Sequence, residues 1–196
     1  MEKETVMTIL LPFLGVILSL LIPACSPTTK GDLANLRSPN DAVKMEAIQK
    51  FSRREGFPLS LLGRHLNQNT ERKAVAIMVE LLRSGKESED IQLSILKAMG
   101  ELGKRTQVSA SSLIEKLRDG NPRIRLTAVE SLGKIRDETA VPALIRLLDT
   151  ETEKYPIIWA LGEIGDKRAV PALNQLLASQ DKYTRYNTNK ALRKIR

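Results

Sequence analysis

The most regular pattern in the chain is the spacing of apolar residues after residue 120. Ile124, Ala128 and Leu132 recur every four residues, which places them on one face of a helix. Asn121, just before this run, is a residue type that caps helix N-termini. The segment therefore predicts a helix with one buried face.

A second helix is predicted directly after the first. Val141, Leu144 and Leu148 form its buried stripe, and Asp137 is placed to open the turn between the two helices. A single helical hairpin cannot bury both of its faces, so we expect further hairpins to stack on this one.

The same pattern returns along the chain. Residues 132–148 and 161–177 are identical at 11 of 17 positions, with an offset of 29 residues. Glycine recurs at one position of the repeat, as Gly100, Gly133 and Gly162, and close packing between helices explains it. Stacked hairpins share a continuous core, so the sequence predicts an all-α solenoid of at least three units.

The longest apolar run lies near the N-terminus. No charged residue interrupts the 19 residues 6–24, and the single cysteine of the chain, Cys25, follows directly. An apolar stretch that ends in a small residue is typical of a secretory signal. The run is also about long enough to span a bilayer, so an N-terminal transmembrane anchor is the alternative. Ser, Pro, Thr and Gly in residues 26–31 predict a flexible tether.

The amino-acid composition argues against several kinds of catalytic and metal-binding site. Charged residues make up 28% of the chain and aromatic residues 4%, which favours helices packed on helices. One cysteine excludes an internal disulfide, and one histidine, His65, argues against a histidine-based metal site or a Ser-His-Asp triad. We expect no catalytic residues, no cofactor and no metal. The net charge of +8 indicates an acidic partner, which lipid headgroups, nucleic acid or a protein would each provide.

The repeat itself carries a resemblance. Leu-Gly, a following Asp, and then Ala-Val-Pro-Ala-Leu resemble HEAT repeats of the phycobilisome-lyase type, closely over residues 121–178 and loosely over residues 40–118. The resemblance implies a right-handed superhelix of helical hairpins over residues 39–196, with partners bound on a concave face lined by second helices. Helix pairing between residues 57 and 90 stays open, because two successive segments there both resemble first helices.

A second resemblance concerns the cysteine. Ile22-Pro23-Ala24-Cys25 resembles the lipobox of bacterial lipoproteins, in which the cysteine thiol receives diacylglycerol and the signal is cut before it. The resemblance implies a signal peptide over residues 1–24, a lipidated Cys25 and a flexible tether over residues 25–38. It places the repeat domain in the bacterial cell envelope, facing the periplasm or the exterior.

Residues that break the rule of the repeat are the candidate partner-binding residues. Trp159 stands where the preceding unit has Glu130, at a position expected to face outward, and tryptophan is a frequent interface anchor. The equivalent second-helix positions Glu115, Arg146 and Gln175 differ in charge and are candidates for the concave face. A basic C-terminal surface, which a terminal solenoid cap also requires, comprises Lys182, Arg185, Lys190, Arg193 and Lys194.

These features favour a membrane-tethered protein–protein interaction scaffold or assembly factor. Some relatives of this repeat type attach bilins to cysteines of antenna proteins, so a bilin-lyase-like enzyme is the first alternative. A nucleic-acid-binding protein that uses the basic surface is the second. The second alternative requires the domain to face the cytoplasm, so membrane topology separates it from the scaffold.

Overall fold

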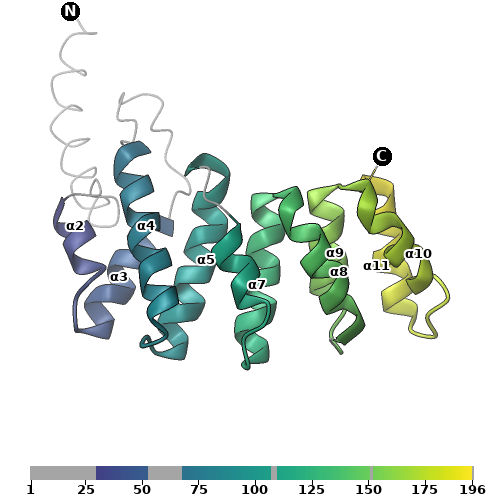
Figure 1. Ribbon diagram of the computed structural model, residues 1–196, viewed down its shortest axis with the longest axis horizontal. Helices are drawn as coiled ribbons and strands as arrows, with labels where there is room; N and C mark the ends of the chain where they lie inside the picture. The colour runs from purple at the N-terminus through teal and green to yellow at the C-terminus, as the bar shows by residue number, and fades with distance from the viewer. Residues whose placement is uncertain (1–29, 53–67, 107–109, 151, 196) are drawn as a thin grey trace, which may run out of the picture.

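A computed structural model describes residues 30–52, 68–106, 110–150 and 152–195. All regular elements in these ranges are helices, and they form two rows that run side by side (Figure 1). The solenoid architecture expected from the repeat is therefore confirmed for this part of the chain.

Helices of the two rows alternate along the chain. Each helix of the first row packs on the next one in that row. The members of the first row are α3 (Asp41–Ser52), α5 (Glu89–Thr106), α7 (Pro122–Ile135), α9 (Tyr155–Ile164) and α11 (Lys182–Lys194). The members of the second row are α2 (Lys30–Asn35), α4 (Gln68–Ser84), α6 (Ser111–Lys116), α8 (Val141–Thr150) and α10 (Val170–Leu176). Two short 3-10 helices lead into α8 and α10, namely η2 (Glu138–Ala140) and η3 (Lys167–Ala169).

One continuous apolar core lies between the two rows. The stripes predicted for α7 and α8 are buried in it, with Leu144 at 0% exposure. The buried members of these stripes are Ile124, Ala128, Leu132, Val141, Leu144 and Leu148. Burial of such side chains contributes about 1.5–3 kcal/mol each, so the shared core is the main stabilising feature of the stack.

Glycine at one repeat position allows the first-row helices to approach closely. Gly100, Gly133 and Gly162 each face the next helix of the row, and a Cβ atom on any of them would lie 2.9 Å from a Cα atom there. Real Cβ atoms do not come so close to a backbone. The packing explanation for the glycine series is therefore confirmed.

Side-chain caps start α7, α11 and the two 3-10 helices. Asn121, the predicted cap, and Asp137, the residue predicted to open the turn, accept hydrogen bonds through Oδ1 from the backbone N–H two residues later, both at 2.9 Å. Asp166 and Asp181 do the same at 2.8 Å and 3.2 Å. These carboxylate and amide oxygens satisfy N–H groups that have no partner inside the helix.

The helix α4 belongs to the second row, although its sequence resembles a first helix. It packs on α2, α5 and α6. Met78 and Leu82, four residues apart, are buried. Helices of both rows bury such a stripe, so spacing alone does not separate them. Within the described residues, α4 packs on the following first-row helix α5, as α6 packs on α7 and α8 packs on α9. The pairing left open between residues 57 and 90 is therefore α4 with α5.

Helical structure also begins before the expected domain boundary at residue 38. Residues 30–35, inside the expected tether, form α2. Leu36 is fully buried, and the carboxylate of Asp32 accepts a hydrogen bond from Nζ of Lys50 at 3.0 Å. These contacts hold α2 on α3, so the expected tether is wrong from Lys30 onward, where the chain already belongs to the solenoid.

Candidate binding groove on the second-helix face

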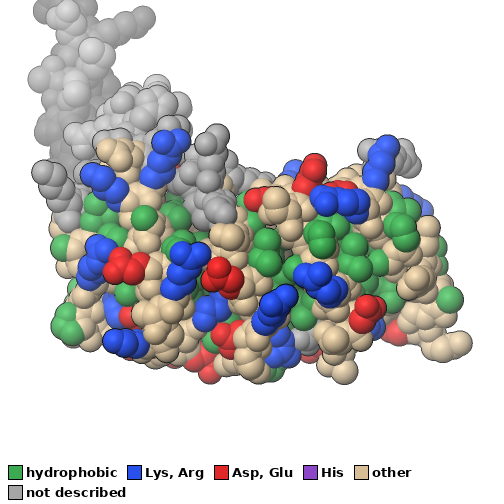
Figure 2. All heavy atoms as spheres, in the orientation of Figure 1, with side chains coloured by type: hydrophobic (Ala, Val, Ile, Leu, Met, Phe, Trp, Pro, Cys, Tyr) green, Lys and Arg blue, Asp and Glu red, His purple; other side chains and the backbone are tan. Residues whose placement is uncertain are grey.

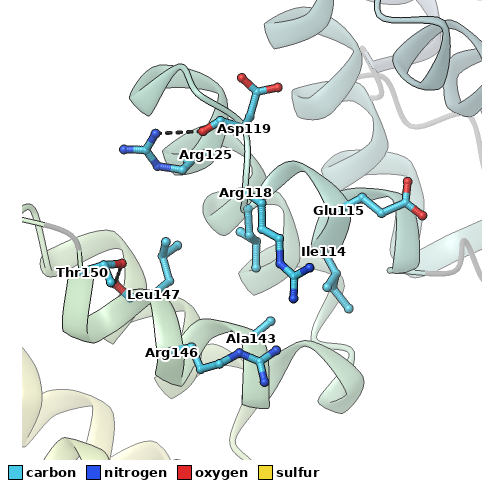
Figure 3. A pocket seen from close by; sticks show the side chains of 10 residues that line it. Ile114, Glu115, Arg118, Asp119, Arg125, Ala143, Arg146, Leu147 and Thr150 are labelled. Carbon is cyan, nitrogen blue, oxygen red and sulfur yellow. Dashed lines mark hydrogen bonds between the residues drawn. The ribbon is translucent and has the colours of Figure 1, made fainter.

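The second-helix face, formed by α2, α4, α6, α8 and α10, is hollowed between α6 and α8. The groove has a volume of about 670 Å³. It is open because α6 and α8 do not pack closely on each other, unlike the first-row helices behind them. The residues that line it are Ile114, Glu115, Leu117, Arg118, Asp119, Arg125, Ala143, Arg146, Leu147 and Thr150 (Figure 3).

Apolar side chains form the floor of this groove. Ile114 and Leu117 come from α6 and its C-terminal end, and Ala143 and Leu147 come from α8. Figure 2 shows apolar side chains between basic and acidic ones on this face. An apolar hollow with charged edges is the usual form of a protein-binding site.

The turn between α6 and α7 is fixed by its own polar groups. Asp119 accepts a hydrogen bond from the backbone N–H two residues later at 3.0 Å, and its other carboxylate oxygen lies 3.2 Å from Nζ of Lys116. Nη1 of Arg125 donates to the backbone carbonyl of Asp119 at 2.9 Å (Figure 3). It also donates to the backbone carbonyl of Gly120 at 3.1 Å. Asp119 and Arg125 therefore hold the turn that carries Arg118.

The remaining charges of the groove are not balanced. Glu115 pairs with Arg83 of α4, with Nη2 and Oε1 3.4 Å apart, so its charge is partly compensated outside the groove. Arg118 and Arg146 are exposed, and neither makes an ion pair or a side-chain hydrogen bond within the described ranges. In Figure 3 both guanidinium groups lie beside the apolar floor. The groove thus presents two positive charges with unused donors.

The predicted site residues fall in different places. Glu115 and Arg146 come together in the groove, whereas Gln175 is exposed on α10 outside it. Trp159 on α9 is half-buried, and its Cζ3 would lie 2.6 Å from a Cβ atom on Gly133. Its ring therefore packs within the first row. Its role as an interface anchor stays a prediction.

The basic C-terminal residues all lie on α11, but their surroundings differ. Arg185 donates to the backbone carbonyls of Ser179 and Gln180 at 2.6 Å and 2.9 Å, as Arg125 does in its own turn. Lys194 pairs with Glu163. The three that remain exposed without an ion pair in the described structure are Lys182, Lys190 and Arg193.

Sequence reasoning missed Arg118 and the apolar floor. Arg118 occupies the repeat position held by Asp149 and Ala178 in the next two units, so an irregular charge was present as a signal. The floor carried no such signal, because Ile114 and Leu147 fit a core stripe equally well.

Several predictions concern residues that the structure does not describe, namely the signal peptide, Cys25 and His65. Within the described ranges, no three His, Cys, Asp or Glu residues are grouped closely enough to hold a metal ion. None of the helices in those ranges has the length and apolarity needed to cross a bilayer.

Sequence comparisons identify the repeat type. The family described as HEAT repeats matches residues 75–156, and the family described as PBS lyase HEAT-like repeat matches residues 157–179. Together the two matches cover more than half of the chain. No curated protein sequence matches it significantly.

Solved structures are similar in fold. A chain of the complex of CpcE and CpcF of phycocyanin lyase from Nostoc sp. PCC7120 aligns with a TM-score of 0.63 and 22% identity, covering 87% of this chain and 66% of that one. The present chain thus spans just under two thirds of that lyase chain. A designed armadillo repeat protein in complex with the peptide (KR)4 aligns with a TM-score of 0.60 and 18% identity, covering 84% and 80%. Identities this low indicate a shared fold alone.

Proposed function

Because HEAT-type repeat families match residues 75–156 and 157–179, we propose that the chain is a membrane-tethered scaffold or assembly factor that binds a protein partner on the second-helix face. The groove between α6 and α8 carries this proposal. Two exposed guanidinium groups border an apolar floor there and have no partner in the described ranges. Arginine beside apolar surface is enriched at protein interfaces, where its donors and its flat face both make contacts.

The similar solved structures support a binding role. The phycocyanin lyase chain is part of a two-protein complex, and the designed armadillo protein is bound to a peptide. Solenoids of stacked helices provide long surfaces for such partners, because each unit adds a helix to the same face.

Support for the tether comes from the sequence. Ile22-Pro23-Ala24-Cys25 ends an uncharged run, as expected for an exported lipoprotein of the cell envelope. Four residues separate Cys25 from Lys30, where α2 begins, and a linker of that length reaches less than about 20 Å even when fully extended. Lipidation of Cys25 would therefore hold the solenoid close to the bilayer.

Replacement of the cysteine tests the tether. We expect Cys25→Ser to abolish labelling by an alkyne fatty-acid analogue and to leave the signal uncleaved, because the hydroxyl does not replace the thiol nucleophile. The measurement is in-gel detection of the label, with intact mass to report cleavage. Ser26→Ala is the control and keeps both label and cleavage. An unlabelled wild-type chain would disprove lipidation.

Site-specific photo-crosslinking in living cells tests the binding face. A photoreactive residue at Glu115 or Gln175 is expected to yield a defined protein adduct, because both positions are exposed on the second row. Lys97 and Glu130, exposed on the first row, serve as controls and should yield none. The same adducts from the first row, or no adduct from the second, would contradict the proposed surface.

A lyase-like activity is the second candidate, because residues 157–179 match the PBS lyase HEAT-like repeat. Incubation of the full chain with a bilin and an antenna apoprotein measures covalent bilin attachment. A rate above the spontaneous one favours the lyase, and an equal rate favours the scaffold.

A further inference from the structure

We infer that the groove between α6 and α8 binds an acidic segment of the partner protein, with Arg118 and Arg146 each pairing with a carboxylate of that segment. This inference rests on the proposed binding function and adds the chemistry of the partner. It commits to a segment in which Asp or Glu side chains alternate with apolar ones.

The groove has positive charge that is available to a ligand. Its two carboxylates are engaged elsewhere, Glu115 with Arg83 at 3.4 Å and Asp119 with Lys116 at 3.2 Å. Arg125 is held by the carbonyls of its own turn. Arg118 and Arg146 are thus the charges available to a ligand, and a guanidinium group matches a carboxylate with two parallel hydrogen bonds.

An apolar floor lies beside these arginines. Ile114, Ala143 and Leu147 line the same groove as both guanidinium groups. A ligand that covers the floor excludes water and lowers the local dielectric constant, which strengthens the ion pairs at its edge. A ligand that places an apolar side chain on the floor, with a carboxylate on each side of it, would contact both the apolar floor and the two arginines.

The residues that line the groove favour a protein ligand over a nucleic acid. No aromatic side chain is among the residues that line the groove, so nothing there offers a stacking platform for bases. Arg118 and Arg146 are the available charges among the lining residues, and two positive charges are too few to follow a continuous phosphate backbone. A peptide with spaced carboxylates and a neutral backbone needs only these two contacts.

Fluorescence anisotropy of the full chain in detergent micelles tests the inference. The probe is a labelled peptide (Glu-Glu-Leu)3, and its neutral counterpart is (Gln-Gln-Leu)3. We expect Arg118→Gln and Arg146→Gln each to raise the Kd of the acidic peptide about tenfold, equivalent to about 1.4 kcal/mol. Lys97→Gln, which removes an exposed positive charge that has no ion pair in the described ranges from the first-row helix α5, is the control and leaves the Kd unchanged.

Several results would overturn the inference. They are equal affinity for both peptides, no measurable binding of the acidic peptide, wild-type affinity of both groove variants, or displacement of the peptide by an oligothymidylate strand with the same arginine dependence. Circular dichroism should be unchanged in both variants, because neither arginine has a partner to lose in the described structure.

Photo-crosslinking and peptide binding together separate an error about the acidic segment from an error about the proposed scaffold function. If photo-crosslinking at Glu115 captures a partner in cells while Arg118→Gln and Arg146→Gln change nothing, the scaffold stands and the acidic segment is wrong. If no second-row position yields an adduct, the proposed scaffold itself fails.

Discussion

Two buried serines of the solenoid differ in the partner of their hydroxyl group. Oγ of Ser131 on α7 donates to the backbone carbonyl of Leu96 on α5 at 2.7 Å, and so connects two first-row helices. Oγ of Ser112 on α6 has no hydrogen-bond partner in the described structure. The two residues are 2% and 3% exposed, so burial does not distinguish them.

Alanine at these two serines should therefore have opposite effects. We expect Ser131→Ala to lower the free energy of unfolding by about 1 kcal/mol, because a satisfied buried hydrogen bond is lost. Ser112→Ala should leave it unchanged or raise it by up to about 1 kcal/mol, because an unpaired buried hydroxyl is removed. Denaturant unfolding of the full chain measures both. The reverse order would mean that Ser112 has a partner the structure does not reveal.

Helices of the first row are held together at the glycine positions. A Cβ atom on Gly133 would lie 2.6 Å from Cζ3 of Trp159 and 2.9 Å from Cα of Ala160. The ring can shift, but the backbone of α9 cannot shift without disturbing the rest of the row. α7 and α9 can therefore lie this close together because residue 133 is a glycine and has no Cβ atom.

Substitution of this glycine is a direct test of the helix spacing. We expect Gly133→Ala to lower the free energy of unfolding by about 1–3 kcal/mol, the usual effect of overpacking, despite the better helix propensity of alanine. Gly120→Ala is the control, because a Cβ atom there meets nothing within 4 Å. Urea unfolding compares the two variants. Equal stabilities would show that α7 and α9 have room to separate.

At the scale of single elements the sequence predicts much of what the structure contains. Asn121 caps its helix, Asp137 opens its turn and Leu144 lies in the core, all as expected, because caps, turns and stripes depend on residues close in sequence. The row of α4 was not predictable, since both rows bury similar stripes. The groove was not predictable either, because it is a space between α6 and α8, and Arg118 gains its role only from that space.

Over the whole molecule, α2 and α11 lie at opposite ends of the stack (Figure 1). The groove is lined by residues of α6 and α8, which come between α2 and α11 in the order of the stack. The proposed lipid attachment precedes α2, so the membrane would meet one end of the solenoid. The second-helix face would then remain accessible to a partner. In a solenoid each unit contacts only its neighbours, so side chains that join several units determine how far unfolding spreads.

One such side chain is Glu163 on α9. Its side chain is 12% exposed, and its carboxylate lies 2.5 Å from Nη2 of Arg136 at the end of α7 and also pairs with Lys194 on α11. The hydrogen bond from Lys194 lowers the pKa of Glu163, burial opposes this effect, and the hydrogen bond from Arg136 adds to it. Arg136 adopts a left-handed conformation, with φ of 61°, where the next unit has Gly165 with φ of 79°. Arg136 thus keeps an unfavourable backbone conformation at the position from which its side chain joins two units.

This lowered pKa makes the ion pairs of Glu163 sensitive to acid. A carboxylate with a lower pKa in the folded state stabilises the fold above its ordinary pKa of 4.5, and this contribution is lost as the pH falls through the folded value. We expect Glu163→Gln to lower the free energy of unfolding by about 1 kcal/mol at pH 7 and to match the wild type once the carboxylate is protonated. Glu101→Gln, which removes an exposed pair with Lys134, should have little effect at any pH. Thermal melting of the full chain at a series of pH values measures the difference. A gap between wild type and Glu163→Gln that stays constant into strong acid would show that shape, not charge, makes Glu163 important.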